Sequence, residues 1–226
     1  MLEVLLRIPN QNIRKLHCRP SDPEHATFVL RGFSSEASYY IAEDKGESDD
    51  FWASFANQLK PETKEKRAAE YQEMVQSAIR EIQQHVVQKV VLSRQFFWDC
   101  PNANARETFN TLLKSYPACT VFAIKHSKYG SWMGASPEVL LESTDEGYRS
   151  MSLAGTRLKN GTRWGNKELE EQKFVTKEVH RSLKAFGGKI SRDKQTTFNA
   201  GPVEHLLTWV NTNNRTLDSK SLAEEL

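Results

Sequence analysis

Residues Val139–Ala154 read V-L-L-E-S-T-D-E-G-Y-R-S-M-S-L-A, and this stretch decides the fold. Its two ends, Val139–Ser143 and Tyr148–Ala154, have the character of strands, and the polar residues Thr144–Gly147 separate them. Two such runs joined by a short turn that contains glycine predict a β-hairpin. A hairpin makes its strands neighbours in antiparallel order, so we expect an antiparallel sheet at this point of the chain.

A second hairpin is expected upstream, where Cys119–His126 and Ser131–Ala135 flank the turn-like residues Lys128-Tyr129-Gly130. Apolar residues at helical spacing predict three helices. The first should begin near Pro61, the second should span Arg106–Ser115, and the third should run from about Lys167 to Ala185. Strands therefore come in hairpins, with helices placed irregularly between them. This pattern predicts an α+β fold of antiparallel sheets flanked by helices.

Several local expectations complete the outline. The β-branched run His85–Leu92 should form a strand. Lys189–Asn199 is polar and should be a loop, and residues 1–60 should be strands and loops. In the last helix, Val175, Val179 and Leu183 recur at steps of four residues, so they should face the core.

Composition and charge exclude several classes of protein. The 31 Lys and Arg residues are offset by 29 Asp and Glu, so a nucleic-acid partner is not indicated. The three cysteines form no C-x-x-C pair, which indicates neither a disulfide framework nor a zinc site. Met1–Arg7 is a poor signal peptide, and no apolar stretch approaches the roughly 20 residues that cross a bilayer. We therefore expect a cytoplasmic protein without a membrane segment, whose oligomeric state stays open.

Four short motifs in a fixed order carry the chemistry. They place a lysine, an isolated carboxylate, a glycine turn and an acidic pair in one chain. The motifs are Gln88–Arg94 (Q-K-V-V-L-S-R), Gly134–Glu138 (G-A-S-P-E), Leu153–Arg157 (L-A-G-T-R) and Lys167–Gln172 (K-E-L-E-E-Q). Each motif alone is weak, but together they suit a magnesium-dependent reaction on a small anionic substrate.

Lys89 and Glu138 each have a functional and a structural interpretation. The amine of Lys89 can act as a general base if it lies in a closed, partly desolvated pocket, but a lysine near a sheet edge also prevents misassociation. Glu138 precedes the apolar run Val139–Leu141, where a partly desolvated carboxyl would have a raised pKa and could donate a proton. The alternative is a solvated glutamate in the turn beside Pro137.

Glu168 and Glu171 lie three residues apart at the start of a predicted helix, so they share one face. Two inward carboxylates would make a hard-oxygen site suited to magnesium, although acidic residues also stabilise a first helical turn through the macrodipole. Gly155 closes a strand at a point where backbone could approach a ligand, or it simply ends the strand. His205 could be a proton donor near a substrate or a satisfied structural histidine.

The order and spacing of the four motifs resemble those of the chorismate-utilising enzymes, which include isochorismate, salicylate, anthranilate and aminodeoxychorismate synthases. The resemblance runs from about Pro61 to Trp209. It implies part of the anthranilate synthase component I-like fold. Residues 1–60 would be an N-terminal strand and loop part, and residues 61–226 the N-terminal portion of the chorismate-binding catalytic domain. Chorismate is the implied substrate and Mg²⁺ the implied cofactor.

The resemblance also implies a reaction, the isomerisation of chorismate to isochorismate. Lys89 matches the lysine with which the isochorismate and salicylate branch activates water, whereas aminodeoxychorismate synthases carry a lysine where this chain has Ala154. Lys89 would take a proton from water as the water attacks C2. Glu138 would protonate the C4 hydroxyl as it departs, and the ring double bonds would shift.

The remaining site residues would bind metal and substrate. By the same resemblance, Glu171 would hold Mg²⁺, which holds the ring carboxylate, and Glu168 would help through water. The backbone of Gly155 and Thr156 would contact that carboxylate, and His205 would lie close to the ring as a catalytic group.

Two departures from the family pattern stand out. The common motif K-D-x-x-E-H is here K-E-L-E-E-Q, so Gln172 replaces the histidine while the carboxylates are kept. Family members continue with a proline-rich substrate loop and a second metal-binding glutamate, so we expect this chain to be an N-terminal fragment whose last residues, Ser221–Leu226, begin a further helix. A salicylate synthase-type enzyme and a truncated, non-catalytic relative are the alternatives. The motifs do not indicate whether the product would serve menaquinone or siderophore biosynthesis.

Overall fold

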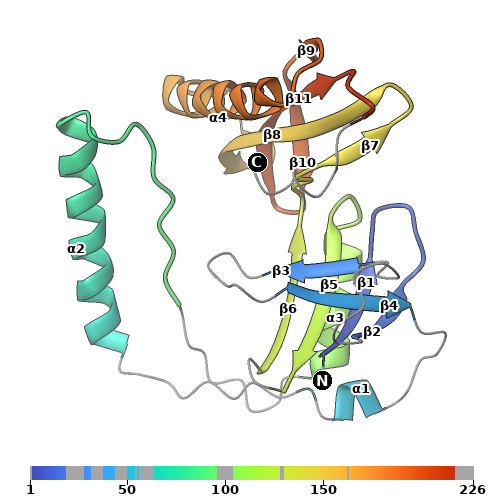
Figure 1. The fold of residues 1–226 in the computed structure, drawn as a ribbon. Coiled ribbons are helices and arrows are strands. Elements are labelled where there is room, and N and C mark those ends of the chain that lie inside the picture. The colour runs from blue at the N-terminus through green and yellow to red at the C-terminus, as the bar shows by residue number, and fades with distance from the viewer. Residues whose placement is uncertain are drawn as a thin grey trace. The chain divides into compact units, whose positions relative to one another are not determined.

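The structure of the chain is a computed structural model, and Figure 1 shows its course. It describes residues 2–18, 28–31, 38–43, 50–53, 55, 64–95, 104–127, 130–161 and 163–216. The residues fall into two compact units. Unit 1 comprises Met1–Pro61 and Trp98–Pro137, and unit 2 comprises Glu62–Phe97 and Glu138–Leu226. Each unit combines two separate segments of the chain. The predicted division into residues 1–60 and 61–226 is of another kind, and it stays a prediction.

Unit 1 is built on a six-stranded sheet of order β3-β4-β2-β1-β5-β6, in which all neighbours are antiparallel. Its elements are β1 (Leu2–Arg7), β2 (Arg14–Cys18), β3 (Phe28–Arg31), β4 (Ser38–Glu43), α1 (Asp50–Ala53), α3 (Ala105–Ser115), β5 (Thr120–His126) and β6 (Gly130–Ser136). The predicted hairpin is the pair β5 and β6, and residues 128 and 129 of its turn lie outside the described part of the chain. The predicted helix Arg106–Ser115 is confirmed as α3.

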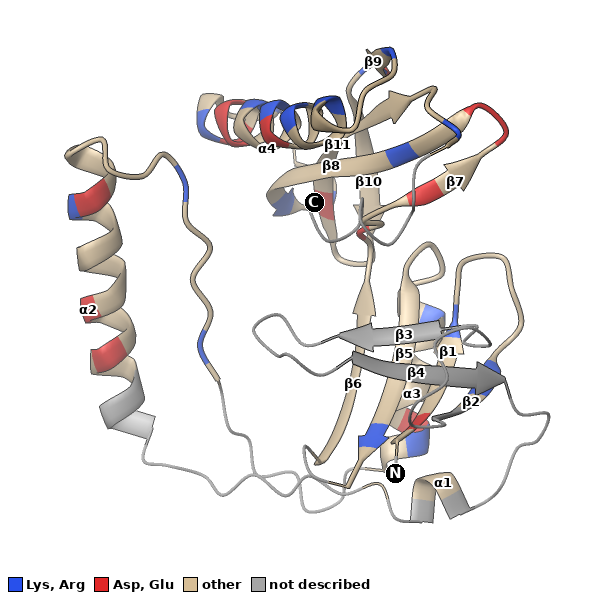
Figure 2. Ribbon diagram, in the orientation of Figure 1, with Lys and Arg blue, Asp and Glu red and all other residues tan. Residues whose placement is uncertain are grey.

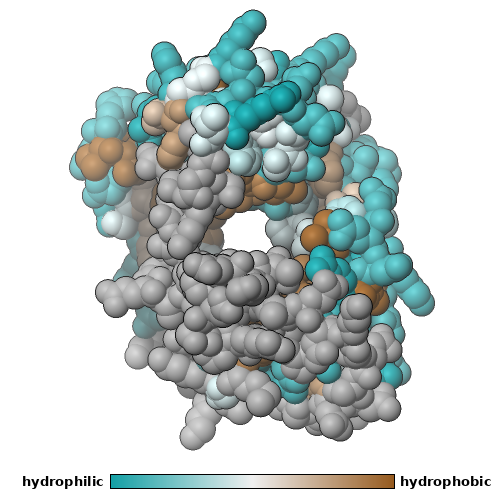
Figure 3. Space-filling model, turned by 45° about the vertical axis from the view of Figure 1, so that its right-hand side comes forward, coloured by the Kyte–Doolittle hydropathy of each residue, from teal (hydrophilic) through white to brown (hydrophobic). Residues whose placement is uncertain are grey.

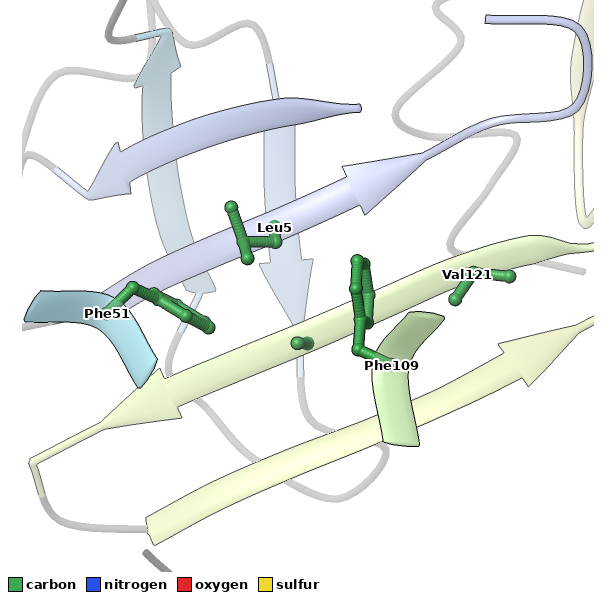
Figure 4. Packing of buried hydrophobic residues seen from close by; sticks show 5 residues of the cluster. Leu5, Phe51, Phe109 and Val121 are labelled. Atoms are coloured by element: carbon green, nitrogen blue, oxygen red, sulfur yellow. The ribbon is translucent and has the colours of Figure 1, made fainter. Parts of the chain in front are cut away.

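The core of unit 1 lies on both faces of its sheet. Side chains alternate along a strand, so Val4 and Leu6 of β1 join one apolar cluster while Leu5 joins another on the opposite face. The second cluster contains Phe51 of α1 and Phe109 of α3, and Figure 4 shows these side chains gathered with Leu5 over the sheet. The helices thus cover the face that Leu5 presents. Phe109 is buried.

Unit 2 contains two long helices and a five-stranded sheet in which β10, β11, β8 and β7 are neighbours in that order and β9 pairs with β11. Its elements are α2 (Lys64–Gln83), β7 (Glu142–Thr144), β8 (Gly147–Leu158), α4 (Asn166–Ala185), β9 (Ile190–Arg192), β10 (Thr196–Ala200) and β11 (Val203–Thr212). All its strand pairs are antiparallel. The hairpin predicted from Val139–Ala154 is β7 and β8, but β7 begins only at Glu142, so Val139–Leu141 were wrongly included in its first strand. The predicted α+β class with antiparallel sheets is therefore confirmed.

Helix α4 packs on β8 and β11 (Figure 1). It ends at Ala185, as predicted, shortly before Gly187 and Gly188, whose positive φ angles of 80° and 87° suit glycine and turn the chain away. Leu183 is fully buried, and Val179 packs against its cluster. Both were predicted to face the core. The third predicted core residue, Val175, is half-buried and lines a cavity together with Val179.

Two predicted segments differ from the structure. His85–Leu92 is not a strand, because α2 ends at Gln83 and residues 86–95 have irregular backbone. A strand needs a neighbour for its backbone N–H and C=O groups, and no described strand pairs with this segment. Lys189–Asn199, predicted as a loop, contains β9 and β10. Their pairing with β11 outweighs the polar composition of the segment.

The described surface carries both signs of charge. Acidic and basic residues are interspersed along α4 (Figure 2). Hydrophilic residues cover most of the coloured surface in Figure 3, broken by small hydrophobic patches. Within the described ranges, no helix combines the length and the apolar character that spanning a bilayer requires.

Phe109 anchors α3 to the sheet of unit 1, with 2% of its surface exposed. Phe109→Ala should lower the free energy of unfolding by about 3–5 kcal/mol, because removal of the ring leaves a cavity. Urea denaturation measures the change. Ile13→Ala, in the same unit but 43% exposed, should cost clearly less; equal losses would contradict the packing of α3 against the sheet.

Candidate active site

Lys89 and Glu171 form an ion pair within unit 2. Lys89 Nζ lies 3.5 Å from Glu171 Oε1, and the two side chains are 27% and 30% exposed. Lys89 comes from the irregular segment after α2, and Glu171 comes from the first half of α4. A partly exposed pair of this kind contributes at most about 1 kcal/mol. Its importance is therefore positional, because it brings the predicted base beside the predicted metal ligand.

A cavity of about 650 Å³ adjoins this pair and is lined by both Lys89 and Glu138. Ser150 and Met151 of β8 form part of its wall, and Phe174 of α4 forms another part. Small-molecule sites typically have volumes of about 300–1,000 Å³. The two predicted proton-transfer groups thus face one space of the size of a small ligand.

The pKa of the Glu138 carboxyl is raised. Burial raises it above the ordinary value of 4.5, while the positive charges of Lys89 and His205 act in the lowering direction and only partly offset the burial. The residue as a whole is nevertheless exposed. Its role as a proton donor therefore stays a prediction.

His205 is oriented by the strand next to its own. On β11 it pairs with Thr156 of β8, and its Nδ1 lies 3.2 Å from Thr156 Oγ1 and 3.1 Å from the carbonyl oxygen of Gly155. A carbonyl oxygen can only accept, so the contact with Gly155 requires that Nδ1 carries the proton. In the neutral ring the other nitrogen, Nε2, is then left as an acceptor, whereas in the imidazolium it is a second donor.

Gly155 is the extra residue of a β-bulge. Thr156 pairs with His205 and Ala154 pairs with Leu206, which leaves Gly155 without a partner in the ladder. Its φ is 70°, and an added Cβ would stand 3.0 Å from Cβ of Glu168. The sequence had suggested that the strand ends at Gly155. Strand β8 instead continues past it to Leu158. Glycine is needed here because the first turn of α4 approaches the bulge closely.

Glu171 and Glu168 each contact a different lysine, and no contact joins their carboxylates in the described residues. Glu171 pairs with Lys89, whereas Glu168 Oε1 lies 3.9 Å from Lys167 Nζ. No group of three or more His, Cys, Asp or Glu side chains is placed to hold an ion in this part of the chain. Joint ligation by the two glutamates stays a prediction.

The predicted site residues nevertheless form one connected set in unit 2. Each is linked to another by contact or by electrostatic influence, and their roles in catalysis and binding stay predictions. The links are Lys89 with Glu171, Glu138 with Lys89 and His205, His205 with Gly155 and Thr156, and Gly155 with Glu168.

Sequence analysis missed the residues of α4 that line the cavity. Phe174, Glu178 and Arg181 all contribute to its wall. They follow Glu171 at steps of three, four and three residues, so all four lie on one face of the helix. That spacing is a signal present in the sequence.

A family model described as chorismate binding enzyme matches residues 36–226, a range that contains the whole candidate site. The chain belongs to the chorismate-binding enzyme family.

Among solved structures, this family member is similar to MenF, the menaquinone-specific isochorismate synthase from Escherichia coli. The match has 20% sequence identity and a TM-score of 0.47, and it covers 55% of this chain and 32% of that one. The chain thus corresponds to about a third of the solved protein. No curated protein gives a significant match to the sequence.

The raised pKa of Glu138 predicts how the stability of this chorismate-binding protein depends on pH. The folded state favours the protonated carboxyl, so the stabilisation is complete below the ordinary value of 4.5 and is lost as pH rises through the raised pKa. Glu138→Gln cannot ionise. Its free energy of unfolding should therefore gain on that of the parent as pH rises from about 4.5 through the raised pKa of Glu138.

Urea denaturation of both proteins at several pH values measures this gap. Glu138→Asp retains a carboxyl and serves as the control, since it should keep the pH dependence of the parent. A gap between Glu138→Gln and the parent that stays constant or shrinks with rising pH would contradict the assigned environment of Glu138.

Proposed function

We propose that the chain carries the proton-transfer half of an isochorismate synthase active site, which isomerises chorismate to isochorismate. The observation that supports this most strongly is the shared cavity of Lys89 and Glu138. An amine and a carboxyl on one small-molecule space are the base and the acid that this isomerisation requires. The family assignment supplies chorismate as the natural candidate for the ligand.

The two side chains would act on opposite ends of one displacement. Lys89, as the neutral amine released from its ion pair with Glu171, takes a proton from a water molecule as the water oxygen forms a bond to C2 of chorismate. The ring double bonds shift, the bond from C4 to its hydroxyl breaks, and Glu138 gives its proton to the departing oxygen. One water enters and one leaves, so the reaction is an isomerisation, and both groups hold the reacting atoms in place without a covalent intermediate.

The state of Glu138 fits the acid role. A group that donates a proton near neutral pH must retain that proton until the reaction, and burial raises the pKa of Glu138 in this direction. The positive charge of Lys89 grows as it accepts a proton, which would favour the developing carboxylate of Glu138. Each transfer thus assists the other.

His205 would hold a polar edge close to the substrate ring. Its Nδ1 is occupied by the backbone of Gly155 and by Thr156 Oγ1, which fixes the plane of the imidazole. The bulge at Gly155 therefore sets both the histidine and the backbone that would contact the substrate carboxylate. These three residues would orient the substrate and not transfer its protons.

In this proposal the carboxylates of α4 would hold Mg²⁺. Mg²⁺ usually keeps several waters and binds through one or two carboxylates together with a substrate oxygen. Glu171 is partly exposed and lies beside Lys89, so it would be the direct ligand, with Glu168 acting through water. When bound, the ion would hold the substrate carboxylate and offset its negative charge.

The direct test is incubation of the purified protein with chorismate and Mg²⁺, followed by chromatographic separation of the products. Isochorismate is expected. Lys89→Ala and Glu138→Gln should each reduce turnover by at least about 100- to 10,000-fold, the usual contribution of a general acid or base.

Matched controls come from exposed residues of α4 outside the cavity. Lys184→Ala and Glu170→Gln remove the same charges and should leave turnover unchanged. Pyruvate with salicylate as products would replace the proposal with a salicylate synthase. Binding of chorismate without turnover would identify a non-catalytic relative, and full activity of Lys89→Ala would remove the base from the mechanism.

A further inference from the structure

A buried hydrogen-bond network joins α4 to β8 beneath the candidate site. Gln172 Nε2 donates to the carbonyl oxygen of Ser152 at 2.9 Å and to Ser152 Oγ at 3.2 Å. It also lies 3.4 Å from Thr176 Oγ1, which is 2.8 Å from Ser152 Oγ. Gln172 is 2% exposed and Ser152 is 0% exposed. The network therefore connects two elements of the site away from solvent.

The face of α4 that packs on the sheet changes character along its length. Glu168, Gln172 and Thr176 occupy this face in the first half of the helix, and Val179 and Leu183 occupy it in the second half. The spacing keeps all of them in one stripe. Apolar packing holds the second half, in the cluster of Leu183. The first half, which carries the predicted metal carboxylates, is instead held by polar contacts and by the approach of Glu168 to Gly155.

The network is not the most stable solution for this position. The carbonyl oxygen of Gln172, Oε1, is buried and has no hydrogen-bond partner. The amide cannot relieve this by turning over, because the backbone oxygen of Ser152 accepts only and needs Nε2 as its donor. A leucine or methionine would fill the space without an unsatisfied acceptor. The unsatisfied Oε1 makes Gln172 less stabilising than an apolar residue would be. This favours a role for Gln172 in fixing the geometry of α4.

The position of Gln172 on α4 affects the ion pair of Glu171 with Lys89. It precedes the core contacts of α4 and follows Glu171 immediately, so the two side chains leave the helix about 100° apart. A rotation of α4 by about 20° would move an atom about 5 Å from the helix axis by about 2 Å. Such a shift would break the 3.5 Å contact between Glu171 and Lys89.

We propose that Gln172 is a positioning residue, which fixes the rotation of the first half of α4 so that Glu171 faces Lys89. The hydrogen bonds to Ser152 and Thr176 fix the orientation of α4 relative to β8. The catalytic consequence rests on the proposed function, whereas the structural consequence does not. The two can therefore be tested separately.

The test compares two variants with one control. Gln172→Met removes every hydrogen bond of the side chain at nearly constant length, and Gln172→His retains a ring N–H donor. Leu183→Val disturbs the apolar half of α4 without touching the network. Should Gln172→Met fail to fold, Gln172→His and Leu183→Val still provide the comparison.

The structural arm needs no activity. In a crystal structure of Gln172→Met, Lys89 Nζ and Glu171 Oε1 should no longer be in contact, while Leu183→Val should retain the pair. Amide hydrogen exchange in the first half of α4 should become at least about tenfold faster in Gln172→Met and remain unchanged in Leu183→Val. An intact ion pair, or unchanged exchange, in Gln172→Met would overturn the proposal.

The catalytic arm uses turnover of chorismate. Gln172→Met should lower kcat about 10- to 100-fold, the effect of misplacing a reacting group by about 1 Å, with KM changed much less. Gln172→His should recover most of kcat. An equal loss of kcat in Leu183→Val would mean that Gln172 acts through stability alone and would overturn the proposal. If the parent does not turn over chorismate, the proposed function fails and the structural arm decides the positioning role by itself.

Discussion

The pairing of β8 with β11, covered by α4, is the constraint on which the site depends. Residues Tyr148–Leu158 run antiparallel to Val203–Thr212 along the whole length of β11. This ladder forms the floor on which α4 packs, and its one irregularity is the bulge at Gly155. The bulge turns a carbonyl toward His205 and makes room for the first turn of α4. A single backbone feature thus places groups from three elements.

Electrostatics then gives each group its character. Glu138 is exposed as a residue, but burial of its carboxyl raises the pKa more than the nearby positive charges lower it. Glu171 forms an ion pair with Lys89. The predicted proton donor and the predicted metal ligand therefore differ in their contacts.

Much of the fold could be predicted, because the signals were local. The hairpin of β7 and β8 and the end of α4 at Ala185 follow from turn residues and apolar spacing. The segment His85–Leu92 could not be predicted, because a strand exists only with a partner and its β-branched residues carry no information about one. The bulge at Gly155 and the contact of Gln172 with Ser152 were equally hidden, since both depend on how α4 docks. The motifs named the site residues, but their joint placement required tertiary contacts.

The most direct test of the central claim is to observe whether chorismate enters the cavity shared by Lys89 and Glu138. The chain has four methionines, of which Met151 lines this cavity and Met133 packs in the core of unit 1. With ¹³C-labelled methionine methyl groups, titration with chorismate should shift the NMR signal of Met151 in a saturable manner and leave that of Met133 in place. Saturable binding that leaves Met151 unmoved would contradict the account.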